Sequence, residues 1–325
     1  MGKFHVPRRG SLQFWPRKRA AKILPSVNWK AFSSKKFESK NGLLGFIGYK
    51  VGMASAVAKD TTANSMTKGK NIVIPVTIIE CPSLKIFSVR FYRDGKVATE
   101  VLSQNIDKEM KRKVRMPTQF KSLDEFSGKL NEYEDIRLIV YSSARKAKLK
   151  KTPEIIELAL TGDINQKFAA AKSMIDRDIN VNDVFGKGQM LDIHAVTKGK
   201  GLQGPVKRFG ITFKQHKSEK GVRRPGSLGP WHPARVTFRT PMAGQLGFFT
   251  RVQYNNKVLE IGKEISELKG SKARTEWQNY GFVNSPYCVV LGSVSGAQKR
   301  PVVLTAAIRP KKITTKQAFE VMEII

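Results

Sequence analysis

The sequence predicts a mainly β protein with a helical insertion and two long basic extensions. Three observations predict this class: β-branched and aromatic runs bounded by Gly, Pro and Asp, a middle segment with helical spacing, and two cationic stretches without a sustained apolar period. The chain has 325 residues, of which 40% are hydrophobic, enough for a packed core. Its formal net charge of +33 indicates an anionic partner.

The first extension covers residues 1–42, where eleven Lys and Arg face one acid and the net charge is +10. Aromatic residues alternate with the basic ones: Phe4, Phe14, Trp15, Trp29, Phe32 and Phe37. Rings that stack on bases, placed between cations that bind phosphates, are typical of a strand that follows RNA. The alternative is a flexible tail with a few rings packed onto the body of the protein.

The β body begins at Leu43, and we expect residues 43–102 to form its first part. The runs GFIGYKVGM, NIVIPVTIIECP and KIFSVRFYRDGKVATEVL predict strands, with a hairpin turn at 93–96. The run GQMLDIHA predicts one more strand within 186–196. The rest of the β body is expected in 253–310, with a turn at Asn255–Asn256.

The segment 103–185 is expected to be a helical insertion. A strand is predicted at 136–141, a short helix from Thr152 and Pro153 to Gly162, and a second helix at 163–175 with apolar residues on one face. Sixteen basic residues against thirteen acids leave it nearly neutral at +3, so we expect it to face solvent or protein more than phosphate. Residues 311–325 are predicted to form a C-terminal helix, because Thr314 and Gln317 have capping-box spacing.

The second extension is a Gly- and Pro-rich arm at 197–252, with twelve Lys and Arg against one carboxylate, Glu219. A stretch of this length and polarity cannot build a core of its own, because its charges and backbone groups have nowhere to be buried. We therefore expect it to be ordered against a polyanion.

Within the arm, GKGLQG at 199–204 matches the GxGxxG pattern of nucleotide-binding loops. Such a loop must open a helix, whereas Pro205 and Val206 follow at once and no helical period appears. The kinase alternative lacks its lysine, HRD and DFG motifs. The glycines are better explained by close approach of the backbone to RNA phosphates, beside Lys198 and Lys200.

The second motif of the arm is RRPGSLGPWHP at 223–233. Ser227 and His232 lack a companion carboxylate, and no helix follows as a nucleophile elbow requires, so a catalytic triad is excluded. The four histidines show no spacing suited to a metal. Trp231 is either a core residue or a ring that stacks on RNA bases, and the two flanking prolines in so polar a stretch favour stacking. Cys81 and Cys288 are expected to be buried, reduced thiols.

Five motifs, in order along nearly the whole chain, resemble the large-subunit ribosomal proteins of the universal L-three family in its archaeal form. They are PRRGSLQFWPRKR, GFIGYKVGM, VTKGKGLQGPVKRFG, RRPGSLGPWHPARV and MAGQLGFFTRV. The resemblance implies a translation-protein type β-barrel built from 43–102, 186–196 and 253–310, and two extensions embedded in rRNA. It also implies early binding to rRNA during assembly, with the arm around Trp231 directed toward the peptidyl transferase centre.

The expected partners are therefore large-subunit rRNA and neighbouring large-subunit ribosomal proteins, in the cytoplasm, with no membrane and no small-molecule substrate. No cofactor is expected beyond magnesium held by the rRNA. Two other functions stay open, an RNA-modifying enzyme and a free nucleic-acid chaperone, although neither extension offers a cofactor loop or a carboxylate pair. The residues expected to bind RNA are Arg8, Arg9, Arg17, Lys18, Arg19, Lys198, Lys200, Lys207, Arg208, Arg223, Arg224, Trp231, His232, Arg235, Gln245 and Arg251.

Overall fold

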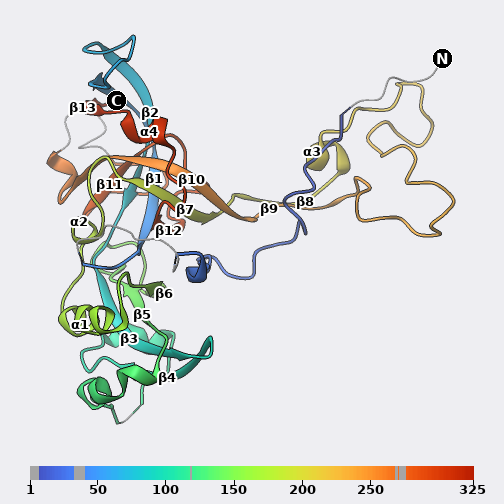
Figure 1. Ribbon diagram of the computed structural model, residues 1–325. Coiled ribbons are helices and arrows are strands. Elements are labelled where there is room, and N and C mark those ends of the chain that lie inside the picture. The colour runs from blue at the N-terminus through green and yellow to red at the C-terminus, as the bar shows by residue number, and fades with distance from the viewer. Residues whose placement is uncertain (1–6, 33–40, 118, 268–269, 271–275) are drawn as a thin grey trace. The chain divides into compact units, whose positions relative to one another are not determined.

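The computed structural model describes residues 7–32, 41–117, 119–267, 270 and 276–325 (Figure 1). It divides into two units: the arm unit comprises residues 1–22 and 196–250, and the body unit comprises 23–195 and 251–325. The chain is mainly β with a few short helices, as the sequence predicts. No helix in the described part of the chain is long and apolar enough to cross a membrane.

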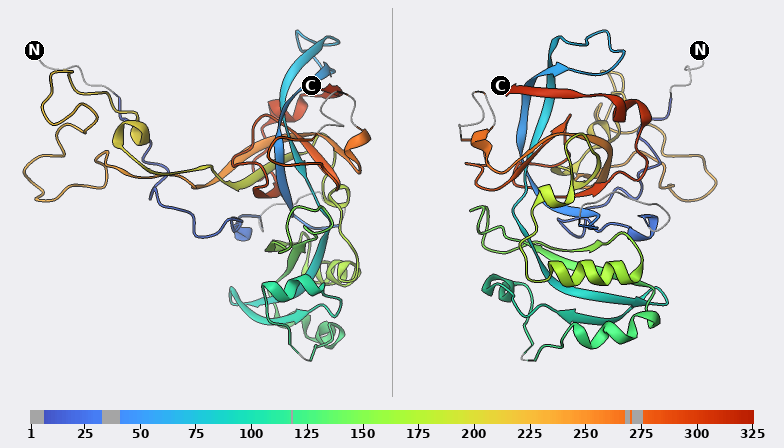
Figure 2. Two further views of the ribbon diagram at one scale, coloured as in Figure 1. Left: turned by 180° about the vertical axis from the view of Figure 1, so that it is seen from behind. Right: turned by 60° about the vertical axis from the view of Figure 1, so that its left-hand side comes forward.

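A seven-stranded sheet forms the larger part of the body unit (Figures 1 and 2). Its order is β12-β7-β10-β11-β2-β1-β13, and β12 also pairs with β1, so the pairings of the six strands other than β13 form a closed ring. The strands are β1 (Gly45–Asp60), β2 (Asn71–Glu80), β7 (Met190–Val196), β10 (Thr250–Gly262), β11 (Tyr287–Leu291), β12 (Pro301–Ala306) and β13 (Phe319–Ile324).

A second sheet of four antiparallel strands has the order β4-β3-β5-β6. Its strands are β3 (Leu84–Arg93), β4 (Lys96–Leu102), β5 (Asp135–Ser142) and β6 (Ile155–Ala159). Asp94 and Gly95, both with positive φ, make the predicted turn between β3 and β4. The Tyr49 hydroxyl lies 2.7 Å from the Ser142 hydroxyl and links the two sheets.

This second sheet corrects two predictions. Residues 84–102 do not continue the sheet of β1 and β2, because β3 pairs with β5 from the expected helical insertion. The helix predicted from Thr152 is wrong, since residues 155–159 form β6 with alternating half-buried and buried positions. The β-branched residues Ile155 and Ile156 suit a pleated sheet better than a helix. The edge of β5 that does not face β3 supplies the backbone hydrogen-bond partners of β6.

The helices are few and short. The predicted helix after Gly162 is α1 (Ile164–Met174), which packs on the four-stranded sheet through Phe168, 6.4 Å from the Phe91 ring. The Gln166 side chain accepts a 3.1 Å bond from the Asp163 amide and so caps its first turn. The other helices of the body unit are α2 (Val181–Val184), α4 (Lys312–Lys316), η1 (Trp29–Phe32), η2 (Lys108–Arg112), η3 (Asp124–Glu132) and η4 (Ile265–Glu267).

The C-terminal segment and the turn predicted at Asn255 also differ from prediction. The C-terminal helix is wrong, because α4 ends at Lys316 and residues 319–324 pair with β1 as β13. The buried ammonium of Lys257 donates to the carbonyls of Thr314, Thr315 and Gln317, which fixes the end of α4 where β13 follows. Asn255 is not in a turn: it sits inside β10 with φ 59°, and its amide donates to Asp192.

Two aromatic residues of the first extension belong to the core. Trp29 and Phe32 are 4% and 2% exposed, and the Trp29 indole donates a 2.9 Å bond to the Glu157 carbonyl. For these two rings the second interpretation of the extension holds, in which a few rings pack onto the body of the protein. A role in stacking on RNA is excluded for both. Phe4 and Phe37 lie outside the described residues. Cys81 and Cys288 are buried free thiols, as predicted, and burial raises the pKa of Cys288 to about 12.

Candidate nucleic-acid interface

The arm unit is rooted in a short hairpin. Strands β8 (Gly199–Gln203) and β9 (Gly244–Gly247) pair antiparallel, so the chain leaves and returns at one place. Gly247 has φ 69°, and a Cβ there would collide with the Lys198 carbonyl oxygen, so this return requires glycine. The hairpin thus holds residues 210–243, which contain no helix or strand, at both ends.

The GxGxxG motif proves to be part of this hairpin. Gly199 and Gly201 lie in β8, and Gly204 precedes α3 (Pro205–Phe209) as its N-cap residue. We predicted no helix here. Pro205 occupies the first position of α3, where proline is favoured because its fixed φ suits a helix and no amide hydrogen is needed. The helix has only five residues and lies between two strands, β8 and β9, that pair antiparallel. A dinucleotide site requires a helix between two parallel strands, and that unit is absent from this described stretch.

Arg208 holds the root of the arm together. Its guanidinium donates to the carbonyls of Gln245 at 2.9 Å, Met242 at 3.0 Å and Arg17 at 3.3 Å. Burial without an opposing charge lowers the pKa of this guanidinium from its ordinary value. One side chain with five donors thereby joins α3, strand β9 with the residues just before it, and the N-terminal segment.

The N-terminal segment packs on the same root. Arg17 donates a 2.8 Å bond to the Arg208 carbonyl and lies 4.3 Å from the centre of the Phe209 ring. Trp15 stacks on Phe209 at 6.2 Å and meets the edge of Phe238 at 5.5 Å. The two extensions are separate in the sequence, but residues 7–22 of the first pack against residues 196–250 of the second and form one unit with them.

The predicted RNA-binding residues fall into two groups. Arg17, Arg208, Gln245 and Arg251 are half-buried, and the first two are used in the contacts above, while the Gln245 amide donates to the Gly247 carbonyl at 3.0 Å. No sequence pattern distinguishes these cations from the exposed ones. The exposed group is Arg8, Arg9, Lys18, Arg19, Lys198, Lys200, Lys207, Arg223, Arg224, Trp231, His232 and Arg235.

The exposed cations of the arm unit lie apart from counter-charges. In the described part of the chain, none of the exposed lysines and arginines just named forms an ion pair. Rings are exposed among them: Trp231 is 87% exposed, Phe213 57% and Phe238 64%, and Arg223 lies 5.0 Å from the Phe213 ring centre. Cations that neutralise phosphates, beside rings that stack on bases, are the elements of a single-strand or loop RNA interface.

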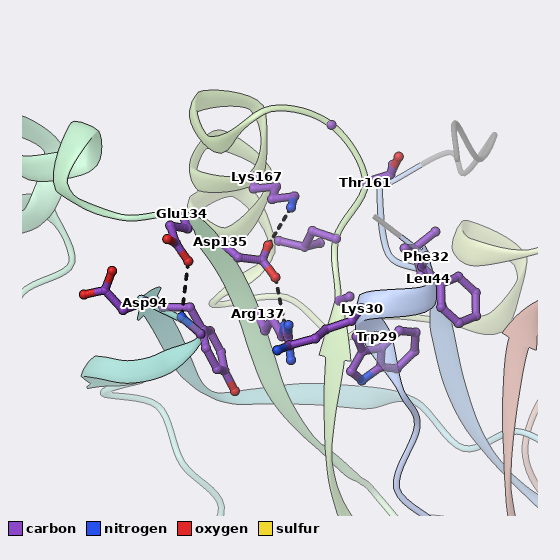
Figure 3. A pocket seen from close by; sticks show the side chains of 15 residues that line it. Trp29, Lys30, Phe32, Leu44, Asp94, Glu134, Asp135, Arg137, Thr161 and Lys167 are labelled. Carbon is purple, nitrogen blue, oxygen red and sulfur yellow. Dashed lines mark hydrogen bonds and ion pairs between the residues drawn. The ribbon is translucent and has the colours of Figure 1, made fainter. Parts of the chain in front are cut away.

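A pocket of about 520 Å³ in the body unit is the alternative candidate (Figure 3). Three of its charged side chains are paired with one another, because Asp135 bonds Lys167 at 2.6 Å and Arg137 at 2.9 Å. Glu134 accepts the Gly95 amide. Within the described residues no group of His, Cys, Asp or Glu is arranged to hold a metal. Asp135, Arg137 and Lys167 are therefore explained as a structural ion-pair group on the four-stranded sheet.

An exposed cationic extension on a β-rich body defines a protein of the nucleic-acid-binding class. The family model for ribosomal protein L3 matches residues 1–323, and the chain belongs to that family. It is 39% identical to large ribosomal subunit protein uL3 of Methanococcus vannielii, covering 95% of this chain and 93% of that one. The uL3 proteins of Archaeoglobus fulgidus and Methanothrix thermoacetophila are 37% and 34% identical, covering 94% and 98% of their lengths.

Family membership makes the chain a structural constituent of the large ribosomal subunit, at work on the cytoplasmic ribosome, and not an enzyme. The resemblance inferred from its five motifs is confirmed. The RNA-modifying enzyme is thereby ruled out as its function.

Arg208→Ala is expected to loosen the root of the arm without unfolding the body unit. Loss of three charge-assisted bonds costs about 1–3 kcal/mol locally after allowance for partial exposure. Hydrogen exchange of the β8 and β9 amides should therefore accelerate about tenfold, and Lys207→Ala, at the exposed neighbouring position, should leave it unchanged. Equal exchange in both variants would contradict the role of Arg208.

Proposed function

We propose that the chain binds large-subunit rRNA through the arm unit, supports early subunit assembly and places residues 210–243 near the peptidyl transferase centre. The observation that carries this proposal is the set of exposed, unpaired cations and exposed rings on a stretch without a core. Such a surface is stable only when phosphates neutralise it. The expected partners are large-subunit rRNA and neighbouring ribosomal proteins.

The body unit serves, in this proposal, as the scaffold. The closed ring of strand pairings supports a translation-protein type barrel formed by β1, β2, β7, β10, β11 and β12. Residues 1–22 and 197–250 act as basic rRNA-binding extensions, in which Arg8, Arg9, Lys198 and Lys200 contact phosphates. Arg17, Arg208 and Gln245 support this surface by holding its root.

The test is binding of the full-length chain to transcribed large-subunit rRNA, together with its sedimentation in a cell lysate. Binding should weaken steeply with salt, with a slope of roughly −0.7 to −0.9 in log K against log salt for each phosphate contacted. The protein should sediment with the large subunit through sucrose. A flat salt titration, or a protein that sediments apart from the subunit, would reject the proposal in favour of a free chaperone.

Trp231→Ala is expected to alter the peptidyl transferase region while the protein still folds and enters subunits. Its ring is 87% exposed, so truncation removes no core packing, and a lost base stack costs about 1–3 kcal/mol. That loss is small beside the summed phosphate contacts. Chemical probing of mutant ribosomes should show changed rRNA reactivity near that centre.

Leu202→Ala is the matched control for Trp231→Ala, because Leu202 is an apolar residue of the same unit that is 78% exposed and lies in the hairpin root. It should leave the reactivity pattern unchanged. A large drop in the melting temperature of the free Trp231→Ala protein would instead show that the ring belongs to a core.

A further inference from the structure

A second concentration of positive charge lies outside the arm unit, on the four-stranded sheet. Residues 108–115 and 145–151 each contain five Lys and Arg, and Glu109 is the only acid in either range. Together they hold ten of the sixteen basic residues of 103–185. The near-neutral total of that segment therefore conceals two strongly basic stretches.

The first stretch is anchored by its apolar residues. Met110 is fully buried against Phe87, Ile139 and Tyr141, and Val114 packs half-buried on the same cluster. The basic residues between these anchors point outward and are exposed. The second stretch is held by buried Ala144 and Ala147 and by turn bonds such as Lys148 N to Arg145 O at 2.9 Å. Both stretches therefore present their cations from a fixed backbone.

Ion pairs show that the two stretches lie side by side. Glu154 binds Lys113 at 3.1 Å and also binds Lys150. Arg145 lies 2.9 Å from Glu109 of the other stretch. The remaining cations form what we term the sheet-end basic surface, and all are exposed and lack an ion pair within the described residues: Lys108, Lys111, Arg112, Arg115, Lys148 and Lys151.

Acidic residues gather at the opposite end of the same sheet. The sheet-end basic surface adjoins the end of β5, whereas residues 124–135, which lead into β5, contain five acids. The eight residues of β5 separate the two ends by about 23 Å at the usual strand rise. Acids at the far end are screened at that distance, so they do not cancel the field of the sheet-end basic surface.

We propose that the sheet-end basic surface is a second rRNA-binding site, separate from the arm unit, which takes the phosphates of an RNA backbone. This inference rests on the proposed function only because it takes rRNA as the partner. None of the exposed large hydrophobic residues lies in 108–117 or 145–151. Protein interfaces are enriched in aromatic residues and depleted of lysine at their centres, so this surface fits phosphate better than a protein.

The fixed backbone of this surface also suits folded RNA. Base-specific recognition requires rings or bidentate donors aimed at base edges, and the sheet-end basic surface offers lysine and arginine heads without exposed rings. Contacts of this kind read the position of phosphates in a helix and carry no sequence information. The body unit would thereby add its own rRNA contacts to those of the arm unit.

The test uses the full-length triple variant Lys111→Gln/Lys148→Gln/Lys151→Gln. Its control is Lys96→Gln/Lys121→Gln/Lys129→Gln, which removes three exposed, unpaired lysines from the same unit outside the sheet-end basic surface. Affinity for transcribed large-subunit rRNA is measured by filter binding across a salt series. The triple variant should bind about tenfold or more weakly at about 0.1 M salt, with a log–log slope shallower by about 2, and the control should match the wild type.

The outcomes separate this inference from the proposed function. If the wild type binds steeply and the triple variant behaves as the control does, the inference falls while rRNA binding by the arm unit stands. Failure of the wild type to bind would overturn both. In assembled subunits, ultraviolet crosslinking should attach nucleotides to peptides from 108–115 and 145–151, and attachment of these peptides only to protein would overturn the inference and indicate an acidic protein partner.

Discussion

Replacement of residues 211–243 by a Gly-Ser linker of equal length is expected to weaken binding to large-subunit rRNA by about a thousandfold or more near 0.15 M salt. The replaced stretch contains seven Lys and Arg and one acid. At roughly 0.7 in the log–log slope for each phosphate contact, loss of seven contacts makes the salt dependence shallower by about 5. This exceeds the effect expected from any single side chain of the arm unit.

The same replacement should leave the body unit folded. Phe209 is the last buried hydrophobic residue before the replaced stretch, and Phe249 is the first one after it. The replaced stretch itself contains no buried hydrophobic residue. The matched control carries residues 211–243 in scrambled order, with the same composition and charge. We expect it to retain the steep salt dependence in simple binding but to enter subunits poorly, because its rings and cations no longer meet their places on folded rRNA.

Two results would contradict this account. Unchanged affinity of the linker variant would show that the arm does not bind phosphates. Normal subunit entry of the scrambled variant would show that only charge matters, as expected of a nonspecific nucleic-acid chaperone. Filter binding and sucrose-gradient sedimentation measure the two properties separately.

Local sequence patterns predicted several of the strands and the exposed arm, because both depend on neighbouring residues. Apolar runs predicted β1, β2, β5 and β7. The absence of a sustained apolar period predicted the arm at 197–252, of which residues 210–243 contain no helix or strand. Which strands pair is decided by distant partners. Residues 84–102 look like a continuation of the first strands, and only the pairing of β3 with β5 assigns them to a second sheet.

Side-chain roles were harder to predict for the same reason. Trp29 lies in a basic, aromatic-rich extension that predicts RNA stacking, yet it is buried in the body unit, whereas Trp231 is exposed in the arm unit as its flanking prolines favour. Arg208 and Lys207 are adjacent basic residues, yet one holds three carbonyls and the other is exposed. Averaged over 103–185, charge conceals the sheet-end basic surface, because five of the thirteen acids lie in 124–135, at the other end of β5.

Glu80→Ala is expected to lower the free energy of unfolding of the body unit by about 3–5 kcal/mol. Glu80 ends β2 and is fully buried. One carboxylate oxygen accepts the amides of Asn284 and Ser285, each at 2.8 Å, and the other accepts the Tyr280 hydroxyl. Alanine would leave the three donors without their acceptor, and the bonds of Tyr280 and Ser285 are buried. Each orphaned buried donor costs about 1–3 kcal/mol.

The matched control is Glu320→Ala, at an exposed position on β13, which should change stability by less than about 0.5 kcal/mol. Urea unfolding followed by circular dichroism measures both variants. A Glu80→Ala protein as stable as the control would show that solvent or a rearranged segment satisfies the three donors. The arm unit should retain its salt-dependent rRNA binding as long as the body unit is folded, which separates this effect from loss of function.

The pH dependence supplies an independent check on Glu80. Burial raises the pKa of Glu80 above its ordinary value, although the hydrogen bonds it accepts oppose this. Because the folded state then holds a proton more tightly than the unfolded state, the contribution of this group to stability is fully present below about pH 4.5 and is lost as pH rises through the folded pKa. Glu80→Gln cannot titrate, so the stability of the wild type relative to this variant should fall as pH rises above about 4.5. A difference that does not change with pH would show that the carboxylate is ionised alike in both states.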